Sequence, residues 1–400
     1  MSPAAPTPYV TLRRRAGAPR PSSPILVRAL ALLAALVLAM APLAARADQT
    51  SQPRVAEAKY YQIVDQNGTV LAQSGQDDRF DPASITKVMT AMVALDSGMD
   101  LDATCTIDQQ EYPGNAQLFG FRTGQQLTLR QLLSIMLVYS ANDAADNVAI
   151  ATAGSIDAFV DKMNAKAQEI GMTNTHFMNT HGLMQDDHYS TAADLVKMGK
   201  YALEHYPFIA QTVSKSSYST SLNGYQLYLR STDQLMDSYL GMIGIKTGTV
   251  ETGCNFLGAS ERHGIRLYVC VLGCPSSSGR FGDSVRLMDW AYANCYQTAT
   301  IPRTRLPIRV ANWSLGFGLK ALVFGSRDLS GLVHPGQDLD YAVYLPTTDL
   351  LVDQGQPIGT STWSQGTRQV CYQTYTASRL QGDVPNVPIF ALPLFVPLQA

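Results

Sequence analysis

Residues 60–73 contain two short runs rich in hydrophobic, β-prone side chains, which is typical of paired strands. Two runs, Tyr60–Val64 and Thr69–Gln73, flank the segment Gln66-Asn67-Gly68. Asn-Gly is the strongest short-range signal of a tight hairpin turn, because both residues tolerate a positive φ. The segment therefore predicts an antiparallel β-hairpin.

From residue 82 onward, apolar positions recur three and four residues apart, which predicts a series of helices. The predicted helices cover residues 82–95, 128–139, 143–152, 159–170 and 192–205. Asp81 is a predicted N-cap of the first helix, with Pro82 at its first helical position. Gly171 is a predicted C-cap, and the segment Thr191 to Asp194 predicts a capping box for the last helix.

The period changes again near residue 243. Residues 243–250, 255–260 and 265–272 are three short apolar runs separated by turn residues, as in an antiparallel sheet. Residues 283–294 return to helical spacing. Residues 56–300 therefore predict an α/β (α+β) domain, with an antiparallel sheet and a helical cluster inserted between its strands.

Beyond residue 302 the composition shifts to short β-prone runs separated by Gly, Pro, Asp and Ser. These runs are residues 305–310, 321–324, 341–345 and 369–375. Residues 305–400 therefore predict a small all-β domain, which we interpret as a sandwich. The tail at 387–398 is apolar, but three prolines interrupt it and it is too short to span a bilayer. Contact with a membrane surface is one interpretation of the tail; an added strand or a packed tail is favoured over it.

Residues 1–47 have the three parts of a secretory signal peptide. Arginines precede an unbroken apolar stretch at 29–41, and Ala45-Arg46-Ala47 is a small-x-small cleavage site that predicts a mature start near Asp48. An uncleaved membrane anchor at 25–45 is the alternative, since that segment is almost long enough to span. Both interpretations place the rest of the chain outside the cytoplasm.

Composition and charge exclude some functions. The chain is 46% hydrophobic and 16% charged, as in ordinary globular proteins. The first 47 residues hold six arginines and no acid, so the remainder carries 24 basic against 32 acidic residues. That balance gives no reason to expect nucleic-acid binding, which requires a basic surface.

Six cysteines in an exported chain permit disulfides. Cys254 and Cys274 lie near the far ends of a predicted hairpin that turns at Arg262-His263-Gly264, so the two residues could face each other. Free buried thiols are an equally good interpretation. Neither the cysteine spacing nor the six histidines form a metal-ligand pattern, so no metal site is predicted.

Three short motifs carry the candidate chemistry: Ser84-Ile85-Thr86-Lys87, Ser140-Ala141-Asn142 and Lys246-Thr247-Gly248. Residues three apart share a helix face, which places Lys87 beside Ser84. A serine hydroxyl becomes a good nucleophile only when a base takes its proton. Lys87 can be that base if burial and a second nearby cation, Lys246, lower its pKa. Free N–H groups in the first helical turn would favour negative charge on a developing oxyanion.

The other two motifs suggest partners for this pair. Ser140 and Asn142 form a short polar segment between two predicted helices, where Ser140 could pass a proton to a leaving amine. In the third motif, Lys246 offers charge for a carboxylate and Thr247 offers a hydroxyl. Gly248 would let a substrate backbone approach the strand closely. Taken singly, each motif could also be an ordinary surface or turn segment.

Together these residues resemble the D-Ala-D-Ala carboxypeptidases among the low-molecular-mass penicillin-binding proteins, over about residues 56–296. The resemblance rests on Pro82-Ala83-Ser84-Ile85-Thr86-Lys87, Ser140-Ala141-Asn142-Asp143-Ala144-Ala145, Asn179-Thr180-His181-Gly182-Leu183, His188-Tyr189-Ser190-Thr191-Ala192, Gly244-Ile245-Lys246-Thr247-Gly248-Thr249 and Arg280-Phe281-Gly282-Asp283. It implies a catalytic domain of the β-lactamase/transpeptidase-like type. It also implies cleavage of the terminal D-Ala from peptidoglycan stem peptides through an acyl-enzyme, β-lactams as covalent inhibitors, and no cofactor.

The resemblance also implies individual roles. Ser84 would be the nucleophile and Lys87 its base, while Ser140 and Asn142 would assist proton transfer. The terminal carboxylate would be held by Lys246, Thr247 and Arg280. The backbone N–H groups of Ser84 and Thr249 would form the oxyanion hole. Gly248 lies between Thr247 and Thr249 and would let the substrate approach the strand. Three residues, His181, Gly182 and His188, are expected to stabilise the fold.

The chain departs from the family pattern at two places in this domain. Asp233 stands where relatives usually carry Asn, and the segment Val250 to Cys254 lacks the usual Ala-Gly ending. Both departures could alter substrate fit. A β-lactamase or a D,D-endopeptidase using the same cleft, and a catalytically silent wall-binding protein, are the rival interpretations. The motifs leave the oligomeric state open.

Overall fold

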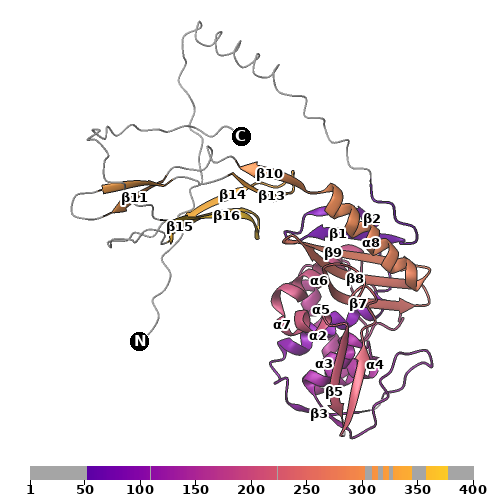
Figure 1. The fold of residues 1–400 in the computed structure, drawn as a ribbon. Helices are drawn as coiled ribbons and strands as arrows, with labels where there is room; N and C mark the ends of the chain where they lie inside the picture. The colour runs from indigo at the N-terminus through magenta and orange to yellow at the C-terminus, as the bar shows by residue number, and fades with distance from the viewer. Residues whose placement is uncertain are drawn as a thin grey trace, which may run out of the picture.

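The computed structural model describes residues 52–108, 110–222, 224–301, 309–313, 319–323, 328–344 and 357–376 (Figure 1). The predicted signal peptide at 1–47 and the apolar tail at 387–398 lie outside the described residues. No helix within the described ranges is both long enough and apolar enough to cross a membrane.

A five-stranded antiparallel sheet forms the centre of the larger region, in the order β2-β1-β9-β8-β7. Its strands are β1 Tyr60–Asp65, β2 Val70–Ser74, β7 Met242–Val250, β8 Gly253–Arg262 and β9 Ile265–Cys274. All five strands were predicted to within three residues at either end. The hairpin turns also match the prediction, since Gly68, His263 and Gly264 have positive φ.

Helices cover both faces of this sheet (Figure 1). One face carries η1 Ala83–Ile85, α2 Thr86–Asp96, α3 Leu129–Val138, α4 Asn142–Ala153, α5 Ile156–Glu169, α6 Ala192–His205 and α7 Pro207–Val213; the other carries α8 Ser277–Asn294. Alternate residues of β9 pack on opposite sides. Tyr268 and Cys270 join the core of the helical cluster, whereas Leu267 and Val269 pack toward α8. Burial on both faces explains why β9 is apolar almost throughout.

Two further hairpins were not predicted. One pairs β3 Thr104–Thr106 with β4 Gln126–Thr128, and the other pairs β5 Ser217–Leu222 with β6 Tyr225–Arg230. The strands β3 and β4, with three residues each, are too short to show a period in the sequence.

The start of the first helix corrects the prediction that Asp81 caps it. Ala83 has a positive φ of 53°, so the chain leaves the helical region directly after Pro82. The turn at Ala83–Ile85 is a 3₁₀ turn without a side-chain cap, and the α-helix begins only at Thr86. Asp81 instead accepts a hydrogen bond from the Thr252 hydroxyl at 2.8 Å.

Two other helices, α5 and α8, begin earlier than predicted, and the start of α6 differs in its cap. Helix α5 begins at Ile156 rather than at residue 159. Helix α8 begins at Ser277 rather than at residue 283, because the Ser276 hydroxyl accepts the N–H of Gly279 as an N-cap. The capping box at the start of α6 is only half formed. The Thr191 hydroxyl accepts the Asp194 N–H at 3.1 Å, but the Asp194 carboxylate accepts hydrogen bonds from residues 174 and 175.

Among the described residues from 297 onward, every regular element is a β-strand, as predicted for this region. Its strands are β10 Gln297–Ile301, β11 Arg309–Trp313, β12 Leu319–Val323, β13 Leu329–Val333, β14 Asp340–Tyr344, β15 Pro357–Gln365 and β16 Arg368–Thr376. They pair antiparallel as β10-β13, β11-β12 and β14-β15-β16. The sandwich arrangement and the boundary at 305–400 stay predictions.

The hairpin turn between β1 and β2 joins the two regions. The Gln337 amide donates to the carboxylate of Asp65 at 2.5 Å and to the hydroxyl of Thr69 at 2.7 Å. The Asn67 amide donates to the carbonyl of Gln365 at 3.1 Å. The predicted Asn-Gly turn therefore also packs against the carboxy-terminal strand region.

Candidate active site

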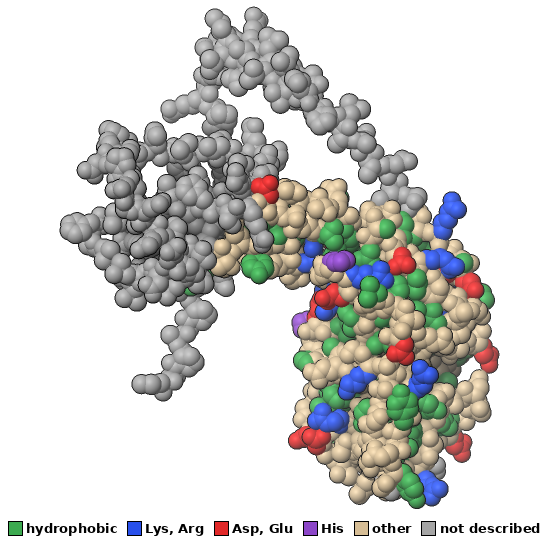
Figure 2. Space-filling view, viewed as in Figure 1, with side chains coloured by type: hydrophobic (Ala, Val, Ile, Leu, Met, Phe, Trp, Pro, Cys, Tyr) green, Lys and Arg blue, Asp and Glu red, His purple; other side chains and the backbone are tan. Residues whose placement is uncertain are grey.

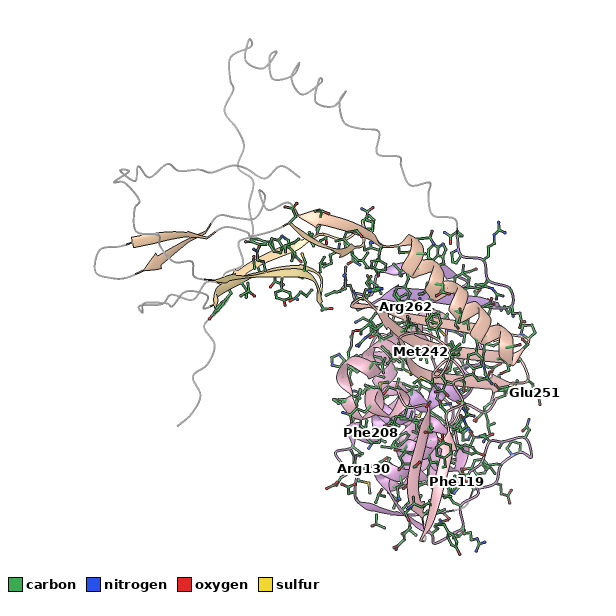
Figure 3. The ribbon with its side chains drawn as sticks, in the orientation of Figure 1. Phe119, Arg130, Phe208, Met242, Glu251 and Arg262 are labelled. Carbon is green, nitrogen blue, oxygen red and sulfur yellow. The ribbon has the colours of Figure 1, made fainter. Side chains whose placement is uncertain are left out.

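The three motifs converge on one place between the helical cluster and β7. The Lys87 ammonium donates to the Ser84 hydroxyl at 2.9 Å, to the Asn142 side-chain oxygen at 2.6 Å and to the His181 carbonyl at 2.7 Å. The Lys246 ammonium donates to the Ser140 hydroxyl at 2.8 Å. In Figure 3, the labelled residues Met242, at the start of β7, and Glu251, directly after its end, mark the strand that carries Lys246.

The backbone around Ser84 is held in an uncommon conformation. A positive φ at a non-glycine residue costs free energy and persists only where the surroundings impose it, and Ala83 has such a φ. Two glycines press against this turn: a Cβ atom on Gly182 would overlap the Ala83 carbonyl, and one on Gly248 would lie 2.8 Å from the Ala83 Cβ. Gly248 is thus needed for the approach of β7 to the Ser84 turn, which adds a reason for this glycine that the sequence analysis missed.

Ser140 also has a positive φ, of 68°, in the link between α3 and α4. This conformation and the α4 start at Asn142 direct both side chains of the motif toward lysines, with Ser140 on Lys246 and Asn142 on Lys87. The second motif therefore lies between the other two.

Both lysines are fully buried, and each has a lowered pKa. Burial, followed by the charge of Lys246, holds the pKa of Lys87 well below its usual range, against the opposing effect of Asp146 and Asp143. Burial, followed by the charge of Arg280, lowers the pKa of Lys246 to about 7. Desolvation disfavours the ammonium form, so burial favours a neutral Lys87 that can accept a proton.

A buried polar cluster around Asp146, which was not predicted from the sequence, acts on Lys87 through the charge of its carboxylate. The buried carboxylate of Asp146 accepts hydrogen bonds from the Tyr112 hydroxyl at 2.5 Å and from the Thr180 hydroxyl. Burial raises the pKa of Asp146, while its two hydrogen bonds and Lys87 lower it. Its position four residues after Asn142, on the same face of α4, was the available signal.

The opposite side of the site is built by β7 and α8. The Thr247 hydroxyl donates to that of Thr232 at 2.6 Å. The Arg280 guanidinium donates to the Gly248 carbonyl and to the Thr249 hydroxyl, each at 2.8 Å. Lys246, Thr247, Gly248, Thr249 and Arg280 thus lie together on this side, whereas Asn142 contacts Lys87 on the other side of the site.

Two histidines near Ser84 and Lys87, the buried His188 and the partly buried His181, have lowered pKa values. Burial first, and then the charge of Lys87, lowers the pKa of His181 to about 3; burial and His176 lower that of His188 to about 3. The His188 ring accepts the N–H of Met178 and lies 3.0 Å from the Thr86 hydroxyl. These contacts fit the structural role expected of both residues.

Cys254 and Cys274 are direct cross-strand partners on β8 and β9, as expected from the hairpin. Both thiols are free and buried. Within the described ranges, no group of three or more His, Cys, Asp or Glu side chains is arranged to hold a metal ion. On the face shown in Figure 2, acidic and basic side chains are interspersed.

Comparisons with known proteins give one consistent result. A family model described as D-alanyl-D-alanine carboxypeptidase matches residues 46–276. The chain is 32% identical to the D-alanyl-D-alanine carboxypeptidase DacA of Escherichia coli, over 72% of this chain and 71% of that protein. It is 29% identical to the D-alanyl-D-alanine carboxypeptidase DacF of Bacillus subtilis, over 82% of this chain and 87% of that protein. Penicillin-binding protein D2 of Listeria monocytogenes, solved in its cefotaxime-bound form, superposes with a TM-score of 0.56 at 29% identity, over 60% of this chain and all of that one.

Proposed function

The chain belongs to the D-alanyl-D-alanine carboxypeptidase family, and from this premise we propose that Ser84 is the nucleophile of a serine carboxypeptidase. The enzyme removes the terminal D-alanine from peptides ending in D-Ala-D-Ala and binds penicillin. The observation that carries the assignment of Ser84 is its 2.9 Å contact with Lys87, a fully buried lysine of lowered pKa.

The reaction follows from the positions of these groups. Neutral Lys87 takes the Ser84 proton as Ser84 Oγ attacks the carbonyl carbon of the penultimate D-Ala. The backbone N–H groups of Ser84 and Thr249 receive the developing oxyanion. Ser140, in contact with Lys246, delivers a proton to the departing D-alanine amine, and the proton that Lys87 took from Ser84 replaces it, so that Lys87 is neutral again. Lys87 then takes a proton from the water that attacks the acyl-enzyme ester and returns it to Ser84 Oγ as the ester bond breaks.

The strand residues bind the carboxylate that marks the end of the substrate. Arg280 already bridges Gly248 and Thr249 on β7, and Lys246 and Thr247 precede them on the same strand. A cationic group and hydroxyls on one side of the scissile bond favour a substrate with a free carboxy terminus. Gly248 lets β7 lie close enough to Ser84 for the two sides to act on one bond.

The natural substrates are peptidoglycan stem peptides, and β-lactams acylate Ser84 as covalent inhibitors. A substrate of this kind lies outside the cytoplasmic membrane. Residues 1–47, with the arginines, the apolar stretch and the Ala45-Arg46-Ala47 site, would export the chain as a cleaved signal peptide.

The test is release of D-alanine from a synthetic pentapeptide ending in D-Ala-D-Ala, using the full chain beside Ser84→Ala. Ser97→Ala is the matched control, because Ser97 is an exposed serine just after the C-terminus of α2, the helix that follows the Ser84 turn. We expect release by the parent and the control, and none by Ser84→Ala. A fluorescent penicillin should label the same two proteins.

Labelling without release would move the assignment to an endopeptidase using the same serine. If a folded parent shows no labelling and no release, the remaining interpretation is a catalytically silent wall-binding protein. Release that persists in Ser84→Ala would contradict the assignment of the nucleophile.

A further inference from the structure

Asp233 is a buried carboxylic acid beside the substrate-binding strand that the mechanism does not use. It lies in the segment between β6 and β7, and its side chain is 7% exposed. One carboxylate oxygen accepts the N–H of Leu235 at 2.8 Å. The other, Oδ2, is buried without a hydrogen-bond partner among the described residues. A buried carboxylate oxygen left unpaired is costly, so its position requires an explanation.

The charges that act on Asp233 belong to the carboxylate-binding groups. They are Lys246 on β7 and Arg280 on α8, and both favour the ionised form of Asp233. In return, Asp233 favours the charged forms of Lys246 and Arg280. The Nε–H of Arg280 is also buried without a partner in this part of the structure. The preceding residue, Thr232, contacts the Thr247 hydroxyl at 2.6 Å, which fixes the Asp233 segment against β7.

We propose, on the basis of the function proposed above, that Asp233 is a specificity-determining residue whose carboxylate competes with the terminal carboxylate of the substrate for Lys246 and Arg280. An ionised Asp233 offsets one of the two positive charges that attract the substrate. A protonated Asp233 leaves both charges to the substrate. The affinity for a free carboxy terminus therefore depends on the protonation state of Asp233.

The pH at which this change occurs follows from the surroundings. Burial raises the pKa of Asp233 to about 6, although Leu235, Arg280 and Lys246 oppose the rise. Below this pH the site is most positive and binds the carboxylate best. Above it, Asp233 ionises and the attraction weakens, and the loss of charge from Lys246, whose pKa lies at about 7, adds to the effect. In a variant without the Asp233 charge, only the Lys246 contribution to the pH dependence of binding should remain.

The experiment compares the parent with Asp233→Asn on two peptides: one ending in D-Ala-D-Ala, and the same peptide with a carboxamide terminus. At pH 8 the substitution should lower KM for the carboxylate peptide about tenfold, from the Coulomb energy of one charge at several ångströms. At pH 5 the two proteins should have equal KM. For the carboxamide peptide KM should not change, and kcat should change little for either peptide.

Asp237→Asn is the matched control, because Asp237 lies four residues further on and pairs with Arg230 at the surface. It should behave as the parent does on both peptides. Asp233→Ala removes the same charge and serves if the Asn variant does not fold. An equal gain on the carboxamide peptide, or a KM difference that does not vary with pH, would overturn the proposal.

The same comparison distinguishes failure of the proposed function. A parent that releases no D-alanine contradicts that function, and Asp233 is then tested by the acylation rate with benzylpenicillin, which also carries a carboxylate. A faster acylation of Asp233→Asn at pH 8 but not at pH 5 supports the role of Asp233. An unchanged rate at both pH values overturns it.

Discussion

The two sides of the active site differ in how completely their buried polar groups are paired. The helix side consists of Ser84, Lys87, Asn142 and Asp146, and the strand side of Thr232, Asp233, Lys246 and Arg280. On the helix side, the Lys87 ammonium makes three hydrogen bonds and both Asp146 oxygens are bonded. On the strand side, Asp233 Oδ2 and Arg280 Nε are buried without partners in the described part of the chain.

This difference matches two kinds of chemistry. Proton transfer needs a donor and an acceptor held in a fixed arrangement before substrate arrives, and a fully bonded network supplies that arrangement. Binding of a carboxylate needs a donor that is still free to bond, and Arg280 Nε is such a donor, whereas the unpaired Asp233 oxygen is an acceptor that opposes a second carboxylate. The helix side is therefore suited to the covalent steps, and the strand side to recognition of the substrate.

The largest expected effect is on the helix side. Replacing Lys87 with Met removes the base, so acylation of Ser84 by penicillin should slow about 10³-fold or more. In the parent, the acylation rate should rise with pH through the pKa of Lys87, which lies well below the usual range for lysine. The measurement is the acylation rate across pH by a fluorescent penicillin.

Lys200→Met is the control, because Lys200 pairs with Glu204 on the surface of α6. It should acylate at the parent rate. A Lys87→Met protein that acylates within tenfold of the parent would show that the base lies elsewhere, and the contrast between the two sides would fail.

The second prediction concerns stability and the strand side. Burial raises the pKa of Asp233 to about 6, above about 3.9 in an unfolded chain, so the folded state holds the proton more tightly. The free energy of unfolding should therefore fall as the pH rises from about 4 to about 6. The loss is about 2 kcal/mol. Asp233→Asn should show a smaller fall over this range, measured by urea unfolding at several pH values.

Asp237→Asn should keep the parent's pH dependence, since this side chain lies at the surface. If Asp233→Asn lost stability between pH 4 and pH 6 as steeply as the parent, Asp233 would not be the group that titrates.

Local pattern was enough to predict much of the fold and the motif residues. The strands β7, β8 and β9 are apolar runs between clear turns, and their order along the chain makes antiparallel pairing the simplest arrangement. The i to i+3 spacing of Ser84 and Lys87 brings their side chains together without further information. Nearby residues with regular geometry are therefore the predictable part.

What could not be predicted depends on contacts between distant segments. Asp81 is a good capping residue by type, but the positive φ of Ala83, which Gly182 and Gly248 press against, moves the helix start to Thr86. Asp233 stood out only as a departure from the family pattern. Nothing in the sequence near it indicates that it lies beside Lys246 and Arg280, because those residues come from two other elements.

The smallest expected effect tests whether the helix side acts as a unit. The charge of Asp146 raises the pKa of Lys87, so Asp146→Asn should lower that pKa further. The acid limb of the acylation profile should then move to lower pH, and the plateau rate should fall by about tenfold or less, because a weaker base transfers a proton less readily. Asp157→Asn, an exposed acid in the first turn of α5, should leave both features unchanged. A lower plateau with an unmoved limb would mean that Asp146 only supports the fold. A moved limb would show that the bonded network behind Lys87 sets the pH at which the enzyme acylates, as Asp233 sets the pH at which it binds.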